Sequence, residues 1–214
     1  MKRHHREKTT FGLLRHGKTV WNQEKRIQGS GNSPLTPDGI AACKAWAEFF
    51  LSPPPTWDRL IVSPLQRAID SAEIINEWLH LPMQIEDELR EQNWGSWEGL
   101  TIDEIKSADP EELEKRIQNG WNFNPPEGES RQEVLQRTRG CLEKCAKKYL
   151  GQHLLVITHL GVIKTLLYYI EKRPFLPTDP KILWKNRFHL IAHSEAAWTI
   201  LRQNILLPEN SDLK

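Results

Sequence analysis

Reactive side chains stand at the ends of three predicted strands. Arg15 and His16 end the first predicted strand, and His159 ends the most apolar one. Ser63 ends another strand, with Arg67 one turn into the helix that follows. In parallel α/β sheets, sites form beyond the carboxyl ends of the strands. If these strands are neighbours, two arginines and two histidines meet at one edge of the sheet.

This set of side chains is suited to phosphoryl chemistry. Two guanidinium groups match tetrahedral phosphate oxygens, and a nearby helix N-terminus adds backbone N–H donors. A neutral His16 imidazole among such cations is a nucleophile, because the arginines lower its pKa by disfavouring a second cation. Glu91 follows a weaker predicted strand and is placed to protonate a leaving oxygen and then activate water.

Each residue alone also has an ordinary structural interpretation. A single histidine at a strand end is more often structural than catalytic, and Arg67 on a helix usually forms a surface ion pair. Glu91 lies in a charged stretch, where carboxylates are usually solvated. Only the joint occurrence at several strand ends favours a catalytic site.

Residues 12–19 also match the P-loop pattern G-x-x-x-x-G-K-[ST]. A P-loop follows a hydrophobic strand, but only residues 9–11 precede Gly12 after a charged leader. Leu13 and Leu14 continue the strand where the loop would lie. The sequence therefore favours a different phosphate site.

Predicted strands and helices alternate along the chain. Strands are predicted at residues 9–14, 59–62, 83–89 and 153–158, with a terminal pair at 188–192 and 197–202. Helices are predicted after Thr36, after Ser63, from the Ser130–Glu133 capping box, and from Gly161. This alternation predicts an α/β fold with a mostly parallel sheet covered on both faces.

The chain of 214 residues is predicted to form one domain, 1–214. Residues 94–129 carry tryptophans, a charged helix at 110–118 and a proline-rich exit, which together indicate a lid inserted over the site. Residues 1–8 are expected to be a disordered leader and residues from about 204 to 214 a polar tail.

Composition excludes several classes of partner. With 29 Lys+Arg against 28 Asp+Glu the net charge is +1, and no long apolar stretch is present, so neither nucleic acid nor membrane is expected. The three cysteines, an odd number, argue against a disulfide framework or zinc site, since Cys141 and Cys145 lie one turn apart in a predicted helix. We expect buried thiols in a cytoplasmic protein.

Residues 14–22, Leu-Arg-His-Gly-Lys-Thr-Val-Trp-Asn, resemble the signature of the histidine phosphatase superfamily, also named for cofactor-dependent phosphoglycerate mutase. Further blocks resemble the family in the same order, at residues 26–29, 33–36, 63–68, 89–91, 95–99, 128–130 and 156–159. The resemblance implies a three-layer α/β/α sandwich, phosphoglycerate mutase-like, with an inserted lid. It also implies that hydrolysis needs no metal and no organic cofactor.

The resemblance further implies roles for individual residues. His16 would be the nucleophile that forms a phosphohistidine, and Glu91 would be the proton donor and then the base. The other implied catalytic residues, which form the phosphate pocket, are Arg15, Arg67 and His159. The implied substrate-binding residues are Asn22, Gln28, Gly29 and Leu160.

One of these positions departs from the family pattern. Leu160 stands where glycine is usual, so its side chain is expected to narrow the pocket, or to reshape the loop if a positive φ is required there.

The short stretch between the acid block and residues 128–130 resembles the phosphatase branch, because mutases carry a longer insertion there. The expected substrate is a small phosphorylated metabolite, hydrolysed without metal, by a monomer or homodimer. Two alternatives stay open: a mutase-type phosphotransferase, and a catalytically weak member that binds a phosphorylated ligand. The lid aromatics either face the leaving group or anchor the lid: Trp94, Trp97, Trp121 and Phe123.

Overall fold

Six strands form one mixed sheet in this computed structural model, which describes residues 8–52, 56–195 and 197–207. The spatial order is β3-β2-β4-β1-β5-β6. The strands are β1 (Thr9–Arg15), β2 (Arg59–Val62), β3 (Met83–Ile85), β4 (His153–Thr158), β5 (Phe188–Ser194) and β6 (Ala197–Ile205).

The four strands that matter for the site are parallel neighbours. β1 pairs with β4, β4 with β2, and β2 with β3, all in parallel, whereas β5 and β6 add an antiparallel edge. Arg15 lies opposite Thr158 in the register, and Val62 lies opposite Ile157. The carboxyl ends of β1, β4 and β2 therefore meet at one edge, as the sequence required.

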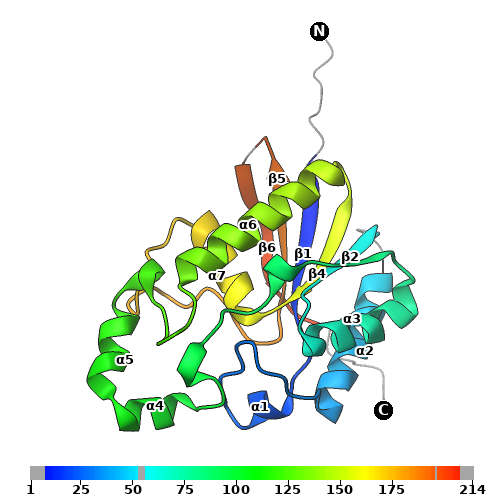
Figure 1. The fold of residues 1–214 in the computed structure, drawn as a ribbon. Coiled ribbons are helices and arrows are strands. Elements are labelled where there is room, and N and C mark those ends of the chain that lie inside the picture. The colour runs from blue at the N-terminus through cyan, green and yellow to red at the C-terminus, as the bar shows by residue number, and fades with distance from the viewer. Residues whose placement is uncertain (1–7, 53–55, 196, 208–214) are drawn as a thin grey trace.

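Helices cover both faces of the sheet, which confirms the predicted three-layer α/β fold (Figure 1). Alternate strand residues point to opposite faces. Phe11 and Leu13 pack against α6 (Arg131–Lys148) and α7 (Leu160–Ile170), whereas Leu14 packs against α2 (Pro37–Leu51) and α3 (Gln66–Leu79). Every central strand is thus buried on both faces.

Local capping signals place the helix starts where the sequence predicts them. Thr36 caps α2, its hydroxyl accepting from the Gly39 N–H at 3.1 Å. Ser130 and Glu133 form a reciprocal capping box at the start of α6. No helix within the described residues has the length and apolar character needed to cross a bilayer.

The weak strand predicted at residues 83–89 is shorter in the structure. β3 ends at Ile85, and a 3-10 helix, Asp87–Leu89, follows. This turn buries Leu89 completely, and its carbonyl accepts from the Thr158 hydroxyl at 2.7 Å. The contact holds the segment that carries Glu91 against the end of β4.

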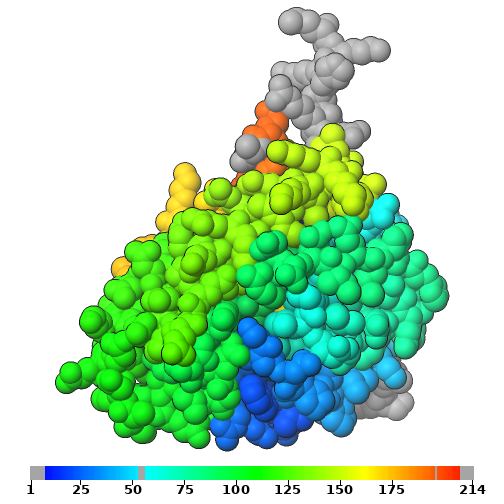
Figure 2. All heavy atoms as spheres, viewed as in Figure 1, coloured from blue at the N-terminus to red at the C-terminus, as the bar shows by residue number. Residues whose placement is uncertain are grey.

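Residues 94–129 contain two helices, α4 (Ile102–Ala108) and α5 (Pro110–Ile117), and two 3-10 turns, Gly95–Trp97 and Gly120–Asn122. They have a small core of their own, made by Trp97, Ile105, Leu113 and Phe123. In Figure 2 their green atoms meet the blue atoms of the segment around α1 (Val20–Gln23). Helix α4 was not predicted, although Thr101 and Glu104 form a capping box at its start.

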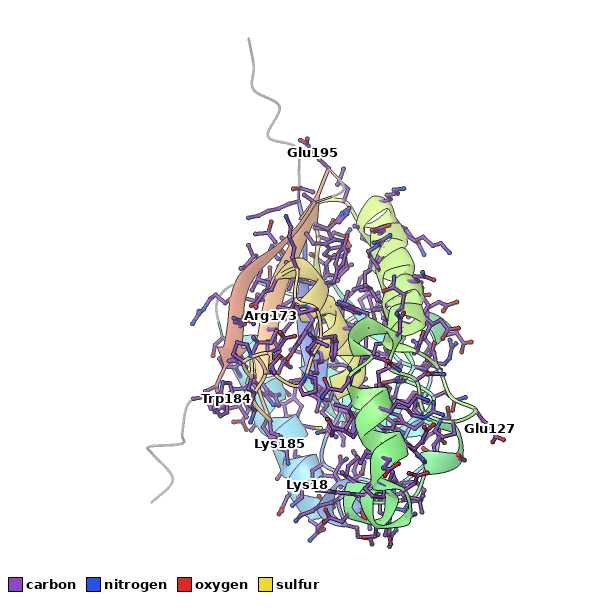
Figure 3. The ribbon with its side chains drawn as sticks, turned by 90° about the vertical axis from the view of Figure 1, so that its left-hand side faces the viewer. Lys18, Glu127, Arg173, Trp184, Lys185 and Glu195 are labelled. Carbon is purple, nitrogen blue, oxygen red and sulfur yellow. The ribbon has the colours of Figure 1, made fainter. Side chains whose placement is uncertain are left out.

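The connection from α7 to β5 begins beside the lid, where the Arg173 carbonyl accepts from Trp121, and then runs away from the exit of the lid (Figure 3). Figure 3 shows Glu127 at one side and Trp184 and Lys185 at the other. At the carboxyl end, β6 continues to Ile205, so the tail expected from about residue 204 begins as a strand. Residues 1–7 of the expected leader and 208–214 of the expected tail lie outside the described residues.

Candidate active site

His16 lies at the end of β1 with only 6% of its surface exposed. Its Nδ1 is 2.7 Å from the Gly17 carbonyl oxygen. Because a carbonyl can only accept, Nδ1 carries the proton and Nε2 carries a lone pair. Burial, and then the charges of Arg15 and Arg67, hold the pKa of His16 well below its usual value. The imidazole is therefore neutral, with Nε2 available as a nucleophile.

Arg67 is almost fully buried and is held by the chain around it. Its Nε donates to His16 Nε2 at 3.3 Å, and its terminal nitrogens donate to the carbonyls of Gly31 (2.7 Å) and Gly29 (2.8 Å). The Ser71 hydroxyl donates to the Arg67 carbonyl and accepts from the Gly17 N–H. Burial lowers the pKa of Arg67 to about 10, so the guanidinium stays charged at neutral pH.

His159 and Arg15 place unpaired nitrogens at the same edge. The His159 and His16 rings are 5.1 Å apart, and His159 Nε2 lies 2.6 Å from the Ser63 hydroxyl. His159 Nδ1 and Arg15 Nε are buried without a hydrogen-bond partner among the described residues. A buried unpaired donor costs about 1–3 kcal/mol. An anion bound at this edge would give the Arg15 guanidinium a partner.

Glu91 faces this edge from the loop after β3. Its two carboxylate oxygens accept from the N–H groups of Gln92 (2.9 Å) and Gly161 (3.2 Å). A Cβ at Gly161 would lie 2.3 Å from Glu91 Oε1, so only glycine leaves room for the carboxylate. The first turn of α7 therefore both binds and orients Glu91.

Arg137, which sequence reasoning missed, holds the Glu91 loop from the opposite side. It donates to the carbonyls of Glu88 (2.6 Å), Arg90 (2.8 Å) and Glu91 (3.2 Å). It also makes a two-pronged ion pair with Glu129, at 2.6 and 2.9 Å. Arg137 and Glu91 are 46 residues apart in the sequence, and no local spacing signals their contact.

A cavity of about 310 Å³ opens onto these groups. We call it the edge cavity. Eight of the nine predicted site residues line it: Arg15, His16, Asn22, Gln28, Gly29, Arg67, Glu91 and Leu160. His159, fully buried, does not line it and lies behind His16. The volume suits a small metabolite.

The predicted substrate-binding residues are held in different ways. Gln28 is buried, and its Oε1 has no partner among the described residues. Gly29 has φ +50°, and a Cβ there would strike the Glu98 carboxylate. The Asn22 side chain caps α1, accepting from the Thr19 N–H at 3.2 Å. Leu160 is the first helical residue of α7, so it needs no positive φ and narrows the cavity through its side chain alone.

The four aromatic residues predicted for the lid lie in different surroundings. Of the four predicted, only Trp94 lines the edge cavity. Trp97 and Phe123 belong to the core of the lid, and Trp121 donates to the Arg173 carbonyl at 2.8 Å. Anchoring of the lid therefore accounts for three of the four rings. Further cavity residues that the sequence analysis missed are Arg26, Ile27, Gln92, Arg131, Lys164, Thr165 and Phe175.

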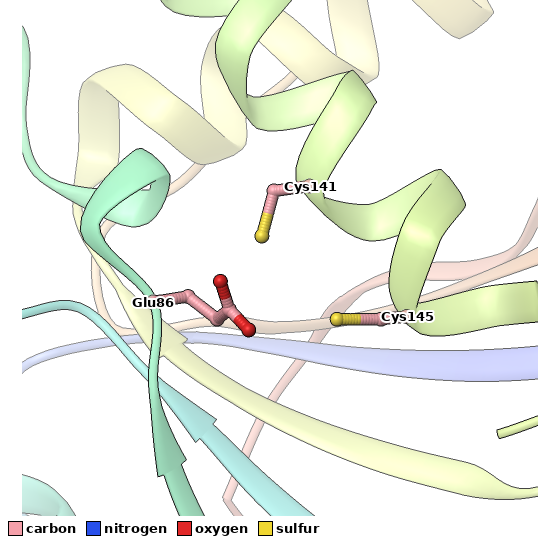
Figure 4. A group of neighbouring side chains, drawn as sticks. All are labelled: Glu86, Cys141 and Cys145. Carbon is pink, nitrogen blue, oxygen red and sulfur yellow. The ribbon is translucent and has the colours of Figure 1, made fainter. Parts of the chain in front are cut away.

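The three cysteines are free and buried. Cys141 and Cys145 of α6 face Glu86, with the ligand atoms of all three within 4.8 Å of one another (Figure 4). The hydrogen bond between the two thiols, followed by burial, raises the pKa of Cys141. None of these three residues lines the edge cavity, so the cluster is separate from the candidate active site.

The chain is similar to known proteins over most of its length. It is 32% identical over 159 residues to a phosphatase of Bacillus subtilis named PhoE, covering 74% of this chain and 76% of that protein. It is 35% identical over 156 residues to a Yersinia pestis protein named as a probable phosphoglycerate mutase, GpmB, covering 72% and 71%. A bifunctional protein of Mycobacterium tuberculosis is 37% identical over 159 residues, but the chain spans only 43% of its length.

Solved structures share the fold. YhfR of Bacillus stearothermophilus superposes with a TM-score of 0.84 at 28% identity, covering 92% of this chain and 98% of that one. A mycobacterial glucosyl-3-phosphoglycerate phosphatase gives a TM-score of 0.79 at 25% identity, covering 92% and 98%. The sequence model of the histidine phosphatase superfamily, branch 1, matches residues 11–205. The chain therefore belongs to branch 1 of the histidine phosphatase superfamily.

Proposed function

We propose that this protein hydrolyses small phosphomonoesters without a metal ion, through a phosphohistidine on His16. The observation that carries the proposal is the 2.7 Å contact between His16 Nδ1 and the Gly17 carbonyl oxygen. Its Nδ1–H donates to the Gly17 carbonyl, which leaves the Nε2 lone pair at the edge cavity beside two guanidinium groups. This is the arrangement that a nitrogen nucleophile needs for attack on phosphorus.

The first step transfers the phosphoryl group to the protein. His16 Nε2 attacks phosphorus while the bond from phosphorus to the ester oxygen breaks. Protonated Glu91 gives its proton to the leaving oxygen, releasing an alcohol. The imidazole ring gains positive charge as the N–P bond forms, and the Gly17 carbonyl stabilises that charge through Nδ1–H.

The second step regenerates the protein. The Glu91 carboxylate takes a proton from water, whose oxygen attacks phosphorus as the N–P bond breaks. Inorganic phosphate leaves, and His16 returns to its neutral state. Arg15 and Arg67 bind the phosphoryl oxygens in both steps, and loss of one such donor typically costs roughly 10²–10³ in rate. His159 packs behind His16, with ring centroids 5.1 Å apart, and so supports the position of the nucleophile.

The test uses p-nitrophenyl phosphate in the presence of EDTA. We expect turnover and an acid-labile phosphoprotein, both lost in His16→Asn. His80→Asn is a matched control, since His80 is exposed and has φ +52°, a conformation that asparagine accepts. Turnover that survives in His16→Asn, or that requires a divalent metal, would refute the proposal. Phosphate binding without turnover would instead support the catalytically weak alternative.

A second candidate function is phosphotransfer of the mutase type, which the similarity to GpmB favours. In that reaction the phosphohistidine passes its group to a second substrate instead of water. Conversion of 3-phosphoglycerate that depends on 2,3-bisphosphoglycerate, measured without net phosphate release, would favour the mutase over the hydrolase.

A further inference from the structure

The edge cavity carries more positive charge than one phosphate group requires. Glu91 is the one carboxylate that lines it among the described residues. The cations that line it number five: Arg15, Arg26, Arg67, Arg131 and Lys164. Arg15 and Arg67 suffice for the phosphoryl dianion, and Arg26 is already paired with Glu24 (3.0 Å) and Glu104 (3.4 Å). Arg131 and Lys164 are left over.

Lys164 has no acidic partner within the described part of the chain. Its Nζ lies over two aromatic rings, 4.7 Å from the Phe175 centroid and 5.2 Å from that of Tyr168, and it makes no hydrogen bond there. Burial and the charge of Arg131 lower the pKa of Lys164 to about 8. Asp179 acts in the opposite direction, but its carboxylate accepts from the Leu176 N–H at 2.9 Å.

Arg131 extends the same positive region. Its guanidinium lies between the rings of Phe123 and Phe175, 4.2 Å from each centroid. One terminal nitrogen donates to the carbonyls of Gly120 (2.9 Å) and Phe175 (3.2 Å). Its other two nitrogens form no hydrogen bond with a described residue, so they are available to a ligand.

The position of Lys164 on α7 determines how far a group bound to it lies from Glu91. Gly161 binds Glu91 at the start of α7, and Lys164 follows three residues later on the same helix. Three residues advance a helix by roughly 4.5 Å, and both positions line the edge cavity. A group bound at Lys164 therefore lies several ångströms beyond the leaving oxygen, where the rest of a substrate would extend.

We infer that Lys164 and Arg131 form a second anion subsite, and that the substrate is a phosphomonoester carrying a second anionic group, either a carboxylate or another phosphate. This inference rests on the proposed function of the same cavity. An anion would pair with an ammonium that makes no hydrogen bond or salt bridge with a described residue, and it would use the free donors of Arg131. The buried rings of Phe123, Tyr168 and Phe175 strengthen both contacts by keeping water away.

The test compares matched substrates that differ in the second group. Glycerol 3-phosphate and 3-phosphoglycerate differ by one carboxylate, and fructose 6-phosphate and fructose 1,6-bisphosphate by one phosphate. We expect kcat/KM for phosphate release to favour the doubly anionic member of at least one pair. Lys164→Gln should reduce that preference by on the order of tenfold or more, because a charge-assisted contact is lost.

Two variants serve as controls. Lys164→Arg should keep the preference, since the charge remains. Lys148→Gln removes a lysine that likewise lies over an aromatic ring, 4.9 Å from the Tyr149 centroid, but outside the edge cavity, and it should keep the preference too. A preference in only one pair identifies the second group as carboxylate or as phosphate.

The inference is overturned if the wild-type protein shows no preference in either pair, or if Lys164→Gln retains it. Such a result, with turnover that still depends on His16, leaves the proposed function intact. Absence of phosphate release from every substrate would contradict the proposed function instead. Calorimetric binding of the same four compounds to His16→Asn then tests the subsite alone, because it needs no turnover.

Discussion

Substitution of Gly161 by alanine should impair proton donation by Glu91 while leaving the other side chains of the site in place. The added Cβ would lie 2.3 Å from Glu91 Oε1, whereas ordinary contacts begin at 3.4 Å, so the carboxylate must move by about 1.1 Å (3.4 − 2.3). The obstructed atom is the end of a flexible side chain, so the fold can adapt. Alanine is also favoured over glycine in a helix, by roughly 0.5–1 kcal/mol.

A displacement of about 1 Å at a catalytic group can cost roughly 10² in rate. We therefore expect Gly161→Ala to lower kcat/KM about a hundredfold for phenyl phosphate, whose leaving oxygen needs a proton. The loss for p-nitrophenyl phosphate should be much smaller, because p-nitrophenolate needs little protonation. Gly140→Ala is the matched control: Gly140 lies in α6, and a Cβ there would meet nothing within 4 Å.

The assay is steady-state hydrolysis of both esters, with urea unfolding of each variant alongside. Equal losses for the two esters would refute the reasoning, since a displaced proton donor must discriminate between leaving groups. A loss of stability in Gly161→Ala would also refute it, because the displacement would then extend beyond the Glu91 side chain. Unchanged activity would show that Glu91 does not act from the position it occupies here.

Three further results follow from the same geometry. Arg137→Met should lower the free energy of unfolding by about 1–3 kcal/mol in urea melts, since the largely buried Glu129 loses its two-pronged partner and keeps only Arg90, at 3.9 Å, as an ionic partner among the described residues. It should also lower turnover of phenyl phosphate more than of p-nitrophenyl phosphate, with partial rescue by Arg137→Lys. The preference for a second anionic group should fall as pH rises through about 8, where Lys164, facing Arg131 and Asp179, loses its proton; a pH-independent preference would contradict this. Burial lowers the pKa of His189 to about 4. As the pH falls below about 6.5, His189 therefore takes up a proton in the unfolded chain before it does so in the folded protein. The free energy of unfolding should fall between about pH 6.5 and 4 by up to about 3 kcal/mol for this reason. His189→Asn should flatten that dependence in urea melts.

The parts of the site that could be predicted are those that stand at strand ends. Arg15, His16 and His159 each end or follow a strand whose apolar pattern is plain in the sequence, and parallel pairing then brings them together. The same logic predicted the two-faced burial of the sheet. The strand predicted at residues 83–89 was too long, because only three of these residues are extended. Asp87 begins a turn, and this turn buries Leu89.

The residues that could not be predicted act across distant segments. Arg137 of α6 reaches the Glu91 loop, and Arg131, at the start of the same helix, meets Phe175 beyond the end of α7. These contacts depend on how α6 and α7 pack on one face of the sheet, and no local pattern records that packing. Sequence motifs thus identified the groups that we propose bind the phosphoryl group. The groups that would recognise the rest of a substrate lie on helix faces. In the sequence alone, a lysine or arginine at such a position cannot be told from a solvated cation, because its surroundings depend on how the neighbouring helix packs. If the proposed second subsite is correct, substrate preference depends on Lys164 and Arg131 more than on the signature around His16. Exchange of Lys164 should then change which phosphomonoester is preferred, while the proposed chemistry at His16 continues.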